Sequence, residues 1–64
     1  MKRFRVMVVK DSALDLSKRL PRDYPDKSDW MSIGVYDSFA EACDKADDWH
    51  DAPNPVMIEE VRKV

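Results

Sequence analysis

Hydrophobic positions alternate with polar ones in three segments of this chain and recur at helical spacing in a fourth. The first alternating segment, Arg3 to Lys10, predicts a β-strand with Phe4, Val6 and Val8 on one face. Its other face changes from basic to apolar along the strand. A strand that is apolar on nearly both faces is usually central in its sheet, so we expect this one in the middle.

Two further strands are predicted, from Asp29 to Tyr36 and from Val56 to about Lys63. In the second strand, the residue set that leads into the helix is expected to point inward. The inward set is Met31, Ile33 and Val35, and the outward set is Trp30, Ser32, Gly34 and Tyr36. In the third strand Val56 and Ile58 do not keep phase with Val61, which predicts a bulge near Glu59 and Glu60.

The helical segment is predicted from about Phe39 to His50. Ser38 and Glu41 form a capping-box pattern at its start, and a proline at position 53 prevents its continuation. Its apolar residues recur at helical spacing on one face: Phe39, Ala42, Cys43, Ala46 and Trp49.

Together these elements predict an α+β fold with the order strand, strand, helix, strand. If the helix crosses one face, the third strand enters antiparallel beside the first, and the three-stranded antiparallel sheet has the order 2-1-3. Residues 11–28 form a long loop between the first two strands, which is either a flexible insertion or a binding loop. The 64 residues leave room for one domain.

Composition adds a cellular context. Charged residues make up 38% of the chain, and its single cysteine, Cys43, cannot form an internal disulfide. Since small domains of oxidising compartments usually rely on several disulfides, we expect a cytoplasmic protein. The apolar run Val6 to Val9 is too short for a signal peptide or a membrane span.

Catalytic and metal-binding constellations are not expected. The only histidine, His50, and the only cysteine, Cys43, are seven residues apart on one helix, too far for a nucleophile and its base to touch. With one glycine in the chain there is no phosphate-binding loop, and no ligand spacing for zinc or calcium. We therefore predict a non-enzymatic protein without cofactor or metal.

An acidic stripe is the first candidate binding surface. Five acids are spaced four, three, four and three along the predicted helix, opposite its apolar face: Asp37, Glu41, Asp44, Asp48 and Asp51. Any exposed helix face is charged, but acids in the last turn oppose the helix dipole at a cost of about 0.3 to 1 kcal/mol each. The stripe thus suits a basic partner.

The predicted outer face of the sheet is a second candidate, because it would bring cationic and stacking side chains together. Its members are Arg3, Arg5, Trp30 and Tyr36. Such a combination is typical of single-stranded nucleic-acid platforms. The alternative is that the arginines stack on the aromatic rings and cover the sheet. A net charge of −2 makes direct nucleic-acid binding the less favoured function.

The last thirty or so residues resemble the small RNA polymerase inhibitor of T-seven-type coliphages. The resemblance rests on the aromatic strand end Tyr36, the run from Ser38 to Trp49 and the closing strand from Val56 to Arg62. It implies a phage-encoded protein that blocks a host enzyme of nucleic-acid metabolism without chemistry, in the host cytoplasm. By position, the acidic stripe and Arg62 would be its contacts.

Four functions therefore stay open. The first is a protein-binding inhibitor or adaptor that docks its acidic helix on a basic surface of a larger complex such as RNA polymerase. The second is an anti-CRISPR-type inhibitor that occupies a DNA-binding groove. The third is a single-stranded nucleic-acid module, and the fourth is a self-associating domain, since both outer strands have free edges. A monomer is favoured, without membrane association.

Overall fold

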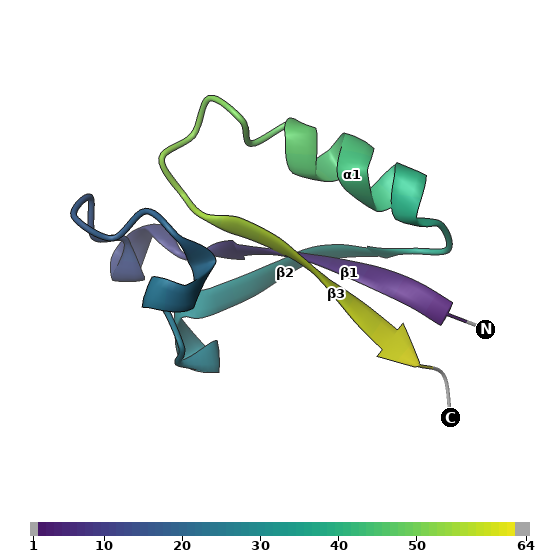
Figure 1. Cartoon of the computed structure of the whole chain (residues 1–64), viewed down its shortest axis with the longest axis horizontal. Coiled ribbons are helices and arrows are strands. Elements are labelled where there is room, and N and C mark those ends of the chain that lie inside the picture. Colours follow the sequence, from purple (N-terminus) through teal and green to yellow (C-terminus); the bar gives the residue numbers. More distant parts are fainter. Residues whose placement is uncertain (1, 63–64) are drawn as a thin grey trace.

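The computed structural model describes residues 2–62, with the side chain of Arg62 outside that description. Three strands form one antiparallel sheet in the order β2-β1-β3, and one helix covers a face of it (Figure 1). The strands are β1 (Lys2–Val9), β2 (Trp30–Tyr36) and β3 (Val56–Arg62), and the helix is α1 (Phe39–Asp47). The predicted α+β fold and strand order are confirmed. Lys63, the predicted end of the third strand, lies outside the described residues.

The central strand β1 supplies the most deeply buried side chains of the sheet. Val6, Val8 and Val9 are all 0% exposed, as expected of a strand that is apolar on both faces. Since neighbouring residues of a strand point to opposite faces, Val6 and Val8 lie on the side of α1 and Val9 on the other side. The helix completes its side of this core with Ala42, which is also 0% exposed.

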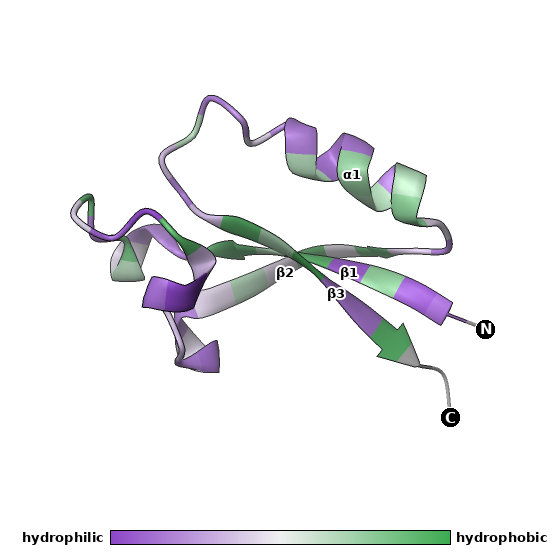
Figure 2. Ribbon diagram, viewed as in Figure 1, coloured by the Kyte–Doolittle hydropathy of each residue, from purple (hydrophilic) through white to green (hydrophobic). Residues whose placement is uncertain are grey.

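The helix begins where the sequence predicts and ends earlier. The hydroxyl oxygen of Ser38 accepts a hydrogen bond from the backbone N–H of Glu41 at 3.1 Å, which is the serine half of the capping box. The predicted end at His50 is wrong, because α1 stops at Asp47 and a turn follows. In Figure 2 the outward side of α1 is largely hydrophilic.

The predicted bulge in the third strand is also wrong. β3 pairs with β1 in unbroken register from Lys2 opposite Arg62 to Val8 opposite Val56. Val61 is out of phase with Val56 and Ile58 because it belongs to the other face of the sheet, opposite Arg3.

The irregularity lies in β2 instead. The register of β1 with β2 shifts between Val6 and Met7, which leaves Ile33 of β2 as the extra residue. An extra residue reverses the alternation of side chains after it. Each of the two residue sets that were predicted to share a face is therefore divided between both faces of the sheet. Paired residues share a face, so Met31, Gly34 and Tyr36 lie on the side of α1, while Trp30, Ser32 and Val35 lie on the opposite side.

The loop between β1 and β2 packs against the sheet face that α1 leaves open. It contains three short 3-10 turns, Asp11–Ala13, Pro21–Asp23 and Lys27–Asp29. Figure 1 shows this blue segment gathered at one end of the sheet, away from α1. Tyr24 of the loop is 4% exposed and forms a cluster with Val9 and Trp30. The loop is therefore part of the core, not a flexible insertion.

Candidate functional site

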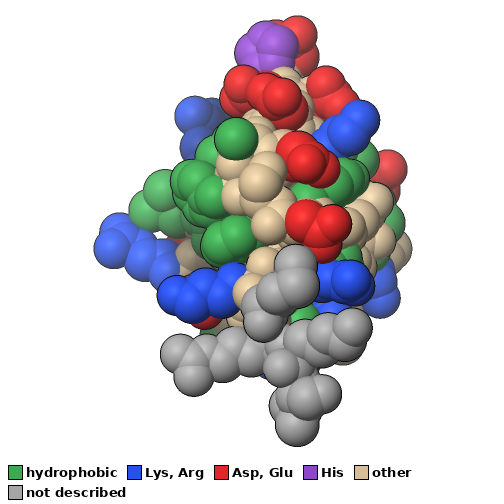
Figure 3. All heavy atoms as spheres, turned by 90° about the vertical axis from the view of Figure 1, so that its right-hand side faces the viewer, with side chains coloured by type: hydrophobic (Ala, Val, Ile, Leu, Met, Phe, Trp, Pro, Cys, Tyr) green, Lys and Arg blue, Asp and Glu red, His purple; other side chains and the backbone are tan. Residues whose placement is uncertain are grey.

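The acidic residues around α1 are exposed and gather on one part of the surface. We define the acidic helix surface as Glu41, Asp44, Asp47, Asp48 and Asp51, all of which are exposed. Figure 3 shows acidic side chains clustered in the upper part of the molecule, near the histidine. Asp47 was not in the predicted stripe, because the helical spacing of the other acids excludes it. It is included in the group because its side chain is exposed at the end of α1.

Most members of this surface lack a cationic partner. Among residues 2–62, no Lys, Arg or His nitrogen lies within 4.0 Å of a carboxylate of Glu41, Asp44, Asp47 or Asp48. Asp51 contacts the imidazole of His50, with Nε2 3.2 Å from its Oδ1. Among the described residues, the surface therefore presents four carboxylates without a cationic nitrogen within 4.0 Å, and Lys45 is the one cation on the same helix.

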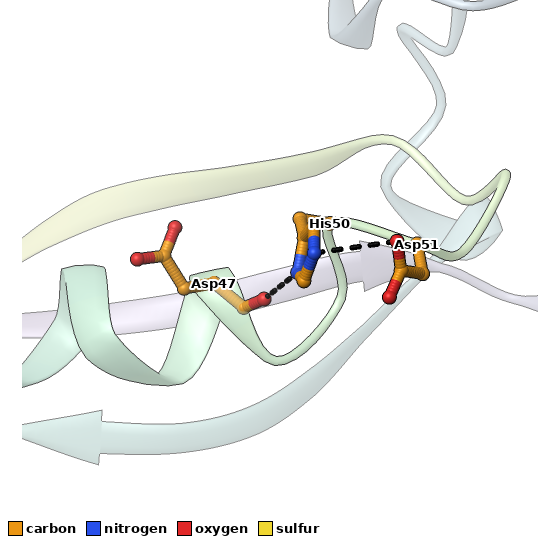
Figure 4. Close-up of polar contacts among 3 residues, drawn as sticks. All are labelled: Asp47, His50 and Asp51. Carbon is orange, nitrogen blue, oxygen red and sulfur yellow. Dashed lines mark hydrogen bonds and ion pairs between the residues drawn. The ribbon is translucent and has the colours of Figure 1, made fainter.

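His50 marks the end of this surface. Its Nδ1 lies 2.7 Å from the backbone oxygen of Asp47, in the last turn of α1 (Figure 4). Its two ring nitrogens thus face a helix carbonyl and a carboxylate, which are both acceptors. Both contacts lie at the carbonyl end of the helix, which is the negative end of its dipole.

The fifth member of the predicted stripe, Asp37, lies elsewhere. It precedes the helix and pairs with Arg3, whose Nε is 3.2 Å from its Oδ1. The other predicted contact, Arg62, lies in β3, but its side chain is outside the described residues.

The cations of β1 are paired, in contrast to the acids of the helix. Lys2 Nζ lies 3.7 Å from Glu60 Oε1, and Arg5 Nη1 lies 3.7 Å from Glu59 Oε1. Both are cross-strand pairs with β3. With the pair of Arg3 and Asp37, every described cation of β1 has an acidic neighbour.

The structure does not bring together the predicted nucleic-acid platform. Trp30 is 6% exposed and its Nε1 donates to the backbone oxygen of Tyr24 at 2.8 Å, so its ring is not free to stack on a base. Tyr36 lies on the opposite sheet face, because of the bulge at Ile33. Only Arg3 and Arg5 of this group share an accessible surface, and each already contacts a carboxylate.

A cleft between two loops was missed by the sequence reasoning. It has a volume of about 320 Å³ and is lined by Leu16, Lys18, Arg19 and Pro53. Lys18 also lies over the ring of Tyr24, with Nζ 5.8 Å from the ring centre. No sequence signal pointed to this cleft, because Pro53 lies between α1 and β3, far along the chain from the loop residues that line the rest of it.

The loop that holds these cations is ordered by its own polar groups. The hydroxyl of Tyr24 accepts from Asp15 N at 2.9 Å and lies 2.9 Å and 3.1 Å from the backbone oxygens of Asp15 and Lys18. The hydroxyl and the backbone N–H of Ser17 donate to Asp15 and hold the pKa of that carboxyl below its ordinary value of 3.8. The backbone N–H and hydroxyl of Ser28 lower the pKa of Asp26 in the same way.

Within the part of the chain that the structure describes, no group of three or more His, Cys, Asp or Glu residues is placed to hold a metal ion. No helix among those residues is long and apolar enough to cross a membrane. No family model, curated protein or solved structure matches the chain.

Proposed function

We propose that this protein is a small, non-enzymatic inhibitor or adaptor that docks its acidic helix surface on a basic surface of a larger protein complex. The observation that supports this function is the charge imbalance between two regions. The cations of β1 have acidic neighbours, whereas four carboxylates of the helix have no cation within 4.0 Å among the described residues.

Helix stability alone does not account for these acids. Asp47 and Asp48 lie at the C-terminal end of α1, where negative charges oppose the helix dipole and basic ones would be favourable. Asp44 and Asp48 are four residues apart and repel each other. A basic partner would remove both penalties on binding, and its opposite potential would also speed encounter.

Basic surfaces of this kind are typical of proteins that bind nucleic acids, since they neutralise phosphates. The partner we favour is a bacterial nucleic-acid-handling complex such as RNA polymerase, with the chain encoded by a phage and acting in the host cytoplasm. A DNA-binding groove of a CRISPR effector is the alternative target for the same docking mode. Single-stranded nucleic acid is a weaker candidate, because Trp30 is buried.

The test compares charge reversal on two surfaces. The double variant Asp44→Lys/Asp48→Lys reverses two unpaired acids of the helix, and Glu59→Lys/Glu60→Lys makes the same change of net charge on β3. Binding of the wild type and of each double variant to purified bacterial RNA polymerase is measured by biolayer interferometry. Pull-downs from bacterial lysate with the same three proteins show whether another complex is retained.

We expect the helix variant to bind at least about tenfold more weakly than the wild type, and the β3 variant to bind nearly as well. Wild-type affinity should fall as salt is raised, because exposed charges are screened. Equal retention of a partner by both double variants would show that the acidic helix surface is not the docking site. Far-ultraviolet circular dichroism is the control that checks whether both variants are folded.

A further inference from the structure

The two outer strands of the sheet differ in how they are protected. β3 carries the charged residues Glu59, Glu60 and Arg62. β2, with the sequence WMSIGVY, contains no charged residue and no proline, although 38% of the whole chain is charged. Charges and prolines are the usual means by which proteins prevent pairing at a free sheet edge. In the described part of the chain, β2 pairs with β1 alone, so its second edge is free.

Exposed apolar side chains also lie on both faces of this strand and directly after it. Met31 and Val35 of β2 are 37% and 43% exposed, and Phe39, in the first turn after β2, is 56% exposed. The other exposed large hydrophobic side chains, Leu16 and Leu20, belong to the loop. An uncharged edge flanked by apolar side chains is a template for another strand.

From this contrast we propose that β2 is a self-association edge, through which two copies of the chain pair antiparallel. A two-fold axis perpendicular to the sheet would relate the copies. The result is one continuous six-stranded sheet with both helices on the same face. This surface is distinct from the acidic helix surface and does not depend on the proposed function.

Charge allows a second copy to occupy the edge of β2 and disfavours the same pairing through β3. Each chain carries a net charge of −2, so two copies repel wherever acidic surfaces meet. When two copies pair through β2, no charged side chain of one β2 lies beside the other β2, because this strand has no charged residue. The same pairing through β3 would place Glu59 and Glu60 next to their counterparts, and like charges on adjacent strands are destabilising.

The bulge at Ile33 limits the strength of this contact. A bulge interrupts regular pairing and increases local twist, so the free edge is usable only in short segments on either side. The contact is then smaller than the 1,200 Å² or so that stable interfaces bury. We therefore expect a dimer that dissociates on dilution.

Two valine variants give a matched test. Val35 lies opposite Arg5, and Val61 lies opposite Arg3, on the same sheet face but on opposite sides of β1. Val35→Lys and Val61→Lys therefore add the same charge to the two edges. Sedimentation equilibrium of both variants and the wild type, from about 10 μM to about 1 mM, covers the range of weak association.

The expected result is a rise of the average mass toward two chains for the wild type and Val61→Lys. Val35→Lys should lower the association constant by at least about tenfold. The acidic variant Asp44→Lys/Asp48→Lys should associate as the wild type does, which separates this proposal from the proposed function. In the wild type, amide exchange of β2 should slow with concentration while that of β3 does not.

Three results would overturn the proposal. One is a wild-type monomer at every concentration, and another is an equal effect of the two lysine variants. The third is loss of association in Val61→Lys alone, which would assign the contact to β3. If Val35→Lys does not fold, Met31→Lys places the charge on the same edge at another exposed position and gives the same readout.

Discussion

The two faces of the sheet are stabilised in different ways. On the face covered by α1, Val6, Val8 and Ala42 are fully buried, and the aromatic pair Phe4 and Phe39 closes one end with ring centres 5.5 Å apart. These contacts are apolar and come from regular elements. Their positions follow from the period of a strand and the period of a helix.

The opposite face is covered by a loop, and its packing depends on directed polar contacts. Tyr24 and Trp30 meet edge to face with ring centres 6.4 Å apart, and the indole donates to Tyr24 O. Asn54 joins the segment before β3 to this region, since its Nδ2 donates to Val9 O at 2.8 Å and Asp11 Oδ1 at 2.9 Å. A loop lacks the regular hydrogen bonds between strands that pair the backbone groups of a sheet. Turns and buried side chains therefore provide the hydrogen-bond partners of its backbone.

The largest effect should come from removing the aromatic anchor of the loop-covered face. Trp30→Ala deletes a nearly buried indole and its hydrogen bond, at a cost of about 3 to 5 kcal/mol. That is much of the total of about 3 to 10 kcal/mol expected for a chain of this size. The matched change on the helix-covered face, Phe39→Ala, should cost only about 1 kcal/mol, because that ring is 56% exposed.

Urea unfolding of both variants, followed by circular dichroism, gives the two free energies of unfolding. Equal losses for Trp30→Ala and Phe39→Ala would contradict the assignment of Trp30 as the anchor of the loop-covered face.

A smaller effect is expected from the hydroxyl of Tyr24, whose ring packs against Trp30 on the same face. Tyr24→Phe keeps the buried ring and removes the hydroxyl that contacts Asp15 and Lys18, so we expect a loss of about 1 to 3 kcal/mol. Tyr36→Phe is the matched control, because its hydroxyl makes no hydrogen bond with any described residue. Chemical denaturation should show a lower midpoint for Tyr24→Phe alone. Indistinguishable midpoints would mean that the hydroxyl network does not stabilise the loop.

The smallest effect is expected for the change in the stability of the loop as the pH is lowered. The carboxyls of Asp15 and Asp26 have pKa values below 3.8, so they bind protons less readily in the folded state. Their stabilisation is present above pH 3.8 and is lost as the pH falls through the lowered pKa values. Carboxyl chemical shifts followed against pH measure both groups. Ser17→Ala should return the pKa of Asp15 toward 3.8 and leave that of Asp26 unchanged.

Most of the fold follows from local patterns in the sequence. The strand order could be predicted because β1 is apolar on both faces, and the helix start because Ser38 has the character of an N-cap. The helix end was predicted three residues late, at His50. The continued apolar spacing to Trp49 favours helix, whereas the chain turns after Asp47 to reach β3.

The candidate site was predictable only in part. The spacing of Glu41, Asp44 and Asp48 is a property of the helix, and all three are exposed as expected. Which charges stay uncompensated depends on cross-strand neighbours such as Arg5 and Glu59, and the sequence does not specify those pairings.

The sequence alone determined the elements, their order and the acidic character of the helix, because periodicity, capping and charge are local properties. The tertiary structure alone decided that Ile33 is the bulge and that Trp30 lies beneath the loop. These features depend on register and on contacts between residues far apart in the chain, where one extra residue turns every following side chain to the other face.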